Sequence, residues 1–121
     1  MSDKEKTYNE SQIAEHLRDL SGWSYEDGSI RHVYKTDGWP TTLMLVNAIG
    51  YVAEAAYHHP DLSVEWGRVV VKLSTHSAGG ITDKDFTLAR KLDEVALWRP
   101  AAGEALDGTP NTFVRSGEPR A

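Results

Sequence analysis

Residues 54–76 read EAAYHHPDLSVEWGRVVVKLSTH, and the clearest secondary-structure signals of the chain meet here. Over residues 68–75 apolar and polar side chains alternate, which predicts a strand with one buried face. Upstream, apolar residues recur at spacings of three and four, which predicts a long helix that starts near Pro40 and runs to His59, where Pro60 stops it. A long helix followed by an alternating strand indicates a fold that mixes helix and sheet.

The remaining elements complete this pattern. The sequence predicts a helix over residues 10–20, a strand pair over residues 23–25 and 30–36 joined by an Asp-Gly turn, a short strand over residues 62–64, and a last helix after Thr82. The order is helix, strand, strand, helix, strand, strand, helix. We therefore expect an α+β fold of the αββαββα type: a four-stranded antiparallel sheet with three helices packed on one face. The other face is expected to be solvated or paired with another subunit.

Length and composition limit the number of domains and the kinds of partner and site. The chain has 121 residues, which fit one domain over residues 10–98, with a disordered segment over 1–9 and a C-terminal extension over 99–121 without regular structure. Thirteen Lys and Arg against eighteen Asp and Glu give a net charge of −5, which disfavours nucleic acid and membranes as partners. No cysteine is present, so thiolate sites are excluded. The sequence shows no signal peptide or membrane span and predicts a cytoplasmic protein.

Three of the five histidines gather near the predicted helix end and strand end. Glu54 and His58 are four residues apart, so on a continuous helix their side chains can meet. His59, the next residue, is rotated by about 100° from His58 on an ideal helix, so the two imidazoles could contact different sides of one bound molecule. His76 follows the alternating strand. Histidines in a last helical turn are also favoured by the helix dipole alone, which leaves a structural interpretation open. Adjacent histidines diverge too far for chelation, so no metal site is expected.

These residues resemble one family, the pterin-4a-carbinolamine dehydratases. The resemblance lies in Glu54-x3-His58-His59-Pro60, followed after five residues by Trp66, after nine more by His76 and after eight more by Asp85. It implies a homodimer or homotetramer that dehydrates 4a-hydroxytetrahydrobiopterin to quinonoid dihydropterin, as in tetrahydrobiopterin recycling, without metal or organic cofactor.

The resemblance also implies the roles of the site residues. His58 and His76 are the expected acid and base, and His59 joins them at the catalytic centre by orienting the pterin. The expected substrate-binding residues are Glu54, Pro60, Trp66, Thr75 and Asp85. From the residues alone, Asp85 is equally well explained as a cap of the helix that starts after Thr82, so both interpretations stay open.

Some positions depart from the family pattern and suggest a second hypothesis. Leu62 stands where an aromatic residue is common, Gly67 where asparagine is usual, and Ser77 where an acidic residue is frequent. A divergent branch of similar proteins, associated with alpha-carboxysomes, acts as Rubisco assembly factors. The alternative is therefore a catalytically inactive dehydratase-like protein that binds Rubisco through its extension or its exposed sheet face.

Overall fold

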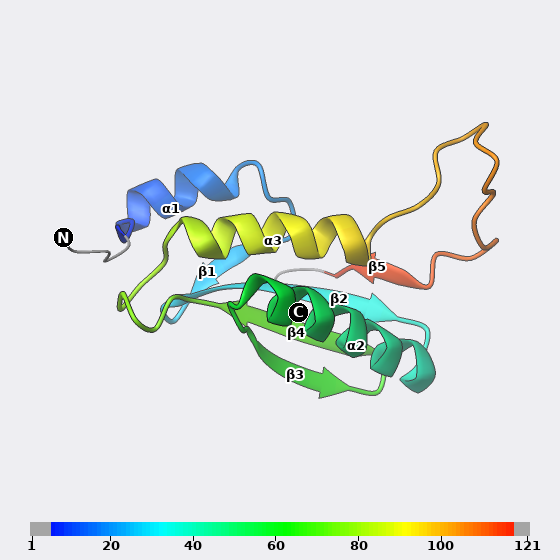
Figure 1. Ribbon diagram of the computed structural model, residues 1–121, viewed down its shortest axis with the longest axis horizontal. Helices are drawn as coiled ribbons and strands as arrows, with labels where there is room; N and C mark the ends of the chain where they lie inside the picture. Colours follow the sequence, from blue (N-terminus) through cyan, green and yellow to red (C-terminus); the bar gives the residue numbers. More distant parts are fainter. Residues whose placement is uncertain (1–5, 118–121) are drawn as a thin grey trace.

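The computed structural model describes residues 6–117 and confirms the predicted αββαββα order, with one further strand after it (Figure 1). The elements are α1 (Glu10–Leu17), β1 (Ser24–Glu26), β2 (Ser29–Thr36), α2 (Trp39–Ala56), β3 (Asp61–Glu65), β4 (Arg68–Leu73), α3 (Asp83–Ala96) and β5 (Val114–Ser116). Within residues 6–117 no helix is long and apolar enough to cross a membrane.

The sheet is antiparallel throughout and has the strand order β1-β2-β4-β3. The β1–β2 hairpin turns at Asp27 and Gly28, whose φ angles of 52° and 83° suit the tight turn that follows the twist of the strands. β2 and β4 are the central pair, with Ile30 opposite Leu73 and Tyr34 opposite Val69. Because both are central strands, they carry the most buried apolar side chains.

The helices cover one face of this sheet, and the core lies between the two layers (Figure 1). The alternation predicted for residues 68–75 is confirmed: Val69, Val71 and Leu73 are fully buried, and Thr75 nearly so. Phe86 and Leu92 contribute the apolar face of α3. α2 and α3 run antiparallel, so the end of α2 lies beside the start of α3 (Figure 1). This pairing brings the histidine segment to the first turn of α3.

The predicted end of the long helix is wrong. α2 ends at Ala56 rather than His59, because Tyr57 adopts a left-handed conformation with φ 53° and ψ 44°. The amide of His58 donates to the carbonyl of Ala53 (3.1 Å), which closes the helix end as in a Schellman-type cap. His58 and His59 therefore lie in the link between α2 and β3, not on a helix. The first helix likewise ends earlier than predicted, at Leu17.

The C-terminal extension is also more ordered than predicted. The sequence predicts no regular structure over residues 99–121, but β5 pairs with the C-terminal end of β2, where Val114 lies opposite Thr36. The loop before β5 is held by Arg99, whose Nη2 donates to the carbonyl of Thr109 (2.7 Å). Of the segment 1–9, residues 1–5 lie outside the described residues. Tyr8 is fixed by its amide, which donates to the carbonyl of Ile81 (2.9 Å).

A buried polar cluster joins β5 to the core. His32 is fully buried; its Nδ1 lies 3.0 Å from Asp93 Oδ1 and its Nε2 lies 2.7 Å from Ser116 Oγ. Asp93 also accepts hydrogen bonds from Trp23 Nε1 and from the hydroxyl of Tyr34. Burial, and next the carboxylate of Asp93, raise the pKa of Tyr34 far above its usual value, so this hydroxyl remains a donor.

Replacing Asp93 by alanine removes the acceptor for three donors. We expect Asp93→Ala to lower the free energy of unfolding by about 3 kcal/mol, because buried polar groups without partners are costly. Urea unfolding measures the change. Glu94→Ala is the matched control, because the Glu94 side chain is exposed and its removal should change the stability by less than about 0.5 kcal/mol. Equal stabilities for the two variants would contradict this interpretation of the cluster.

Candidate active site

A surface hollow of about 310 Å³ lies where the α2–β3 link, the end of β4 and the start of α3 meet. It is lined by Tyr57, His58, His59, Ser74, Thr75, His76, Ser77 and Lys84. All three histidines that the sequence singles out therefore border the same hollow. They come from two chain segments that the sheet brings together, since the link leads into β3 and His76 follows β4, the neighbour of β3.

His58 is held by a buried carboxylate. Its Nε2 lies 2.7 Å from Asp85 Oδ1, and Asp85 is fully buried. Because an ionised carboxylate can only accept, Nε2 carries the hydrogen of this bond. The other ring nitrogen, Nδ1, is then the one that can exchange a proton with a ligand.

Asp85 caps α3 and also holds His58. Its Oδ2 accepts from the amide of Thr82 (2.9 Å) and from the hydroxyl of Thr75 (2.8 Å), while its Oδ1 binds His58. The first contact is part of the capping box predicted at the start of α3, where Thr82 Oγ1 also accepts from the backbone. Three hydrogen bonds and the N-terminus of a helix stabilise the negative charge in this buried position.

His59 also contacts a carboxylate, that of Glu54, but this pair is exposed. The His59 Nε2 lies 2.8 Å from Glu54 Oε1. The sequence predicts that Glu54 meets His58, and this pairing is wrong. The reason is the left-handed Tyr57, which ends the helix before His58 and turns the chain so that the next residue, His59, faces Glu54.

His76 is presented by a tight loop that follows β4. The carbonyl of Thr75 accepts from the amides of Ala78, Gly79 and Gly80, and the amide of Thr75 donates back to Gly80 (2.9 Å). Gly79 has φ +75°, a conformation that glycine adopts without strain. Within residues 6–117 the His76 ring has no hydrogen-bond partner, so both of its nitrogens are available to a ligand.

The other predicted binding residues divide into two groups. Thr75 lines the hollow, whereas Glu54 and Asp85 are outside the lining and contact His59 and His58 respectively. Pro60 directs the chain into β3 and is not part of the lining. Trp66 lies at the opposite end of the β3–β4 hairpin, roughly 20 Å from Pro60 along the strand, and within one chain it does not reach the hollow.

The sequence does not single out four residues that line the hollow: Tyr57, Ser74, Ser77 and Lys84. Tyr57 borders it because of its unexpected backbone conformation, and its ring meets the His59 ring edge-on at 5.7 Å. Lys84 lies in the first turn of α3, one residue from Asp85, and this adjacency is the signal that could have found it. Leu62, which stands where the family commonly has an aromatic residue, packs against the core and does not line the hollow.

Two other arrangements do not compete with this hollow. In the described part of the chain, no three His, Asp or Glu side chains are grouped to hold a metal ion. One hydrogen-bonded chain, Ser116–His32–Asp93, resembles the serine–histidine–aspartate triad of hydrolases. However, His32 is wholly buried, and the backbone of Gly22 packs so closely on it that an added Cβ would lie 2.5 Å from His32 Nε2. No leaving group can reach that nitrogen, so the cluster is structural.

Comparisons with known proteins show the family. The family described as Pterin 4 alpha carbinolamine dehydratase matches residues 6–95, about three quarters of the chain. The chain belongs to the pterin-4a-carbinolamine dehydratase family. It is 42% identical over 87 residues to a Roseiflexus castenholzii protein and 45% identical over 87 residues to one from Aquifex aeolicus, both named "Putative pterin-4-alpha-carbinolamine dehydratase". These matches cover 72% of this chain, and 94% and 88% of those proteins respectively.

A solved structure shows the same fold. The crystal structure of a transcriptional coactivator/pterin dehydratase from Brucella melitensis superimposes with a TM-score of 0.70 at 33% identity, and covers 75% of this chain and 99% of that one. Since the family match ends at residue 95, the loop after α3 and β5 lie outside it. This family member therefore carries a C-terminal extension on the shared dehydratase fold.

The Asp85 contact predicts the tautomer of His58. We expect nitrogen-resolved NMR of the imidazole rings to show the hydrogen on Nε2 of His58, and Asp85→Asn to change that signal, because an amide can also donate. Glu54→Gln is the matched control and should change His59 but not His58. A His58 signal that is the same in Asp85→Asn and in the wild type would contradict the assignment.

Proposed function

We propose that this chain dehydrates a 4a-hydroxytetrahydropterin to the quinonoid dihydropterin. The observation that carries the proposal is the arrangement of three histidines around one hollow, with His58 fixed by the buried Asp85. Family membership supports the same reaction. Within this substrate class, the family resemblance implies 4a-hydroxytetrahydrobiopterin, and the reaction itself takes place on the pterin ring.

The reaction needs two proton transfers. The C4a–O bond breaks as the oxygen takes a proton and leaves as water, and a ring nitrogen loses its proton as the C=N bond forms. Imidazole exchanges protons near neutral pH and can serve at either step. We assign His58 and His76 as this pair, one delivering the proton to oxygen and the other accepting the proton from nitrogen.

The remaining residues position the ring. The contact between Glu54 and His59 keeps the His59 imidazole at the rim, where it can orient the pterin. Thr75 binds Asp85, and Asp85 holds the His58 ring in place. Because Asp85 holds Nε2 of His58, each turnover returns this ring to the same tautomer, which keeps Nδ1 ready for the next proton transfer.

Removing the His76 imidazole tests the proposal. We expect His76→Ala to lower kcat for dehydration of 4a-hydroxytetrahydropterin by about 100-fold, because general acid or base catalysis contributes about this much. Absorbance follows the reaction, and circular dichroism checks that the variant folds. His16→Asn, in α1 and outside the hollow, is the control and should retain the rate. Wild-type turnover in His76→Ala would refute its role.

We further propose that α2 mediates self-association into a dimer or tetramer. Residues 39–53 contain no charged residue, and Leu43, Met44 and Tyr51 are exposed on the outer side of this helix, Tyr51 by 76%. A chain with a net charge of −5 would repel its own copy, and an uncharged apolar face avoids that repulsion. Such a face is typical of an interface between subunits.

Charge on this face should break the assembly. We expect Tyr51→Glu to convert the protein to the mass of one chain in light scattering, because a carboxylate would be buried without a partner. Lys72→Glu, on the opposite face of the sheet in β4, is the control and should leave the mass unchanged. The same mass for wild type and Tyr51→Glu would contradict the proposed interface.

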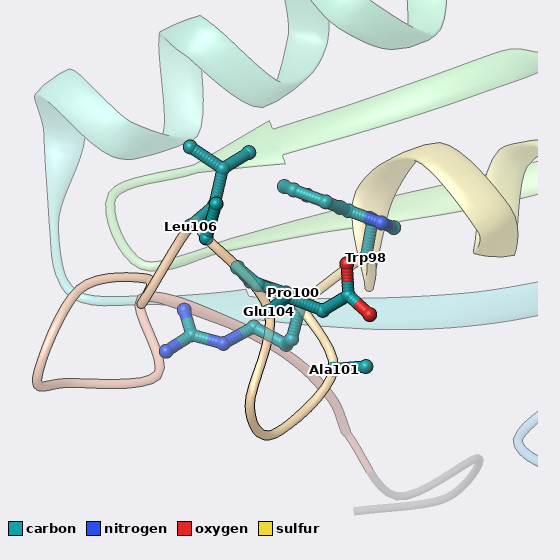
Figure 2. A pocket seen from close by; sticks show the side chains of 7 residues that line it. Trp98, Pro100, Ala101, Glu104 and Leu106 are labelled. Atoms are coloured by element: carbon teal, nitrogen blue, oxygen red, sulfur yellow. The ribbon is translucent and has the colours of Figure 1, made fainter.

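We also propose a second candidate function, that of a Rubisco assembly factor, which needs an exposed binding surface outside the shared fold. Outside the family match, Trp98 and Leu106 are exposed and border a hollow of about 330 Å³ that the extension forms beside the end of α3 (Figure 2). If this candidate is right, the folded protein will show no turnover, and Trp98→Ala will abolish co-purification with Rubisco. Turnover without any Rubisco binding will exclude it.

A further inference from the structure

A second hollow adjoins the histidine hollow along α3. Its volume is about 420 Å³, and it is lined by Ala56, His58, Asp83, Lys84, Thr87, Leu88 and Lys91. Two of these residues, His58 and Lys84, also line the histidine hollow. These two residues therefore form a border that the hollows share, and a ligand placed against His58 lies next to both hollows.

The lining of the second hollow has an apolar floor and a basic end. Ala56 and Leu88 supply apolar surface between α2 and α3. Lys84 and Lys91 lie seven residues apart on α3, which is about 10 Å along the axis at 1.5 Å per residue. Lys84 therefore lies at the border that the two hollows share, and Lys91 lines the second hollow only.

The acidic residues near these lysines already have partners. Asp83 accepts a hydrogen bond from the hydroxyl of Tyr8, and the pKa of Tyr8 is raised, mainly by that bond. Glu94 meets Lys91 at 2.9 Å, with both side chains more than half exposed. An exposed pair of this kind is weak, so the ammonium group of Lys91 can turn to an anionic ligand at little cost.

We propose that the second hollow binds the substituent on carbon 6 of the pterin, and that it selects a substituent with an apolar stem and an anionic end. This inference rests on the pterin binding of the proposed function, and it adds the substrate class. The ring would lie among the histidines, the stem on Ala56 and Leu88, and the terminal carboxylate or phosphate at Lys91. A neutral dihydroxypropyl substituent would use neither the apolar floor nor the lysine.

Binding of two stable dihydropterins to the full chain tests the inference. Dihydrofolate carries an aryl stem with terminal carboxylates, and dihydrobiopterin carries the neutral dihydroxypropyl group. We expect calorimetry to give a dissociation constant about tenfold lower for dihydrofolate, and this ratio to fall about tenfold in Lys91→Ala, because a charge-assisted contact is lost. Lys91→Arg should keep the ratio. Lys72→Ala, which removes an exposed lysine from β4, should not change it.

The outcomes separate the inference from the proposed function. Turnover of 4a-hydroxy-6-methyltetrahydropterin tests the dehydration alone, because a methyl group cannot reach Lys91. Turnover of this substrate together with an unchanged ratio in Lys91→Ala overturns the inference and leaves the function. Absence of turnover with a Lys91-dependent ratio overturns the function and supports the binding hollow. Equal affinity for the two dihydropterins also overturns the inference.

Discussion

The buried carboxylate of Asp85 is the constraint on which the rest of the site depends. One oxygen caps α3 through Thr82 and binds Thr75 at the end of β4, and the other holds His58 after α2. A buried charge is stable only when its hydrogen bonds are satisfied, so separating these three segments would leave Asp85 without partners and would destabilise the fold. The same contact that closes the fold therefore sets the tautomer of a proposed proton-transfer residue.

Much of this arrangement follows from the sequence, because it depends on local patterns. The alternation over residues 68–75 predicts the buried face of β4, and the Asp27-Gly28 turn predicts the first hairpin. The Thr82 cap and the carboxylate of Asp85 are read from their spacing. With the fold order known, His58 and His76 are expected at one end of the sheet, where the hollow is found.

The remaining features could not be predicted, for physical reasons that differ. Tyr57 adopts a left-handed conformation that few residues other than glycine favour. No local sequence pattern therefore predicts that α2 ends at Ala56, or that Glu54 contacts His59 instead of His58. β5 is three residues long and is stabilised by a strand some 80 residues away in sequence. The distance of Trp66 from the histidines follows from β3, an extended strand that separates Pro60 from Trp66, but the family resemblance had placed both residues at one site.

A pterin is expected to bind among the three histidines. A crystal structure of the protein with a bound dihydropterin tests this directly. We expect the ring to occupy the hollow between His58, His59 and His76, with Nδ1 of His58 facing the ring and Nε2 still bound to Asp85. A ring bound elsewhere, for example against Trp98 on the extension, or a His58 turned away from Asp85, would contradict it.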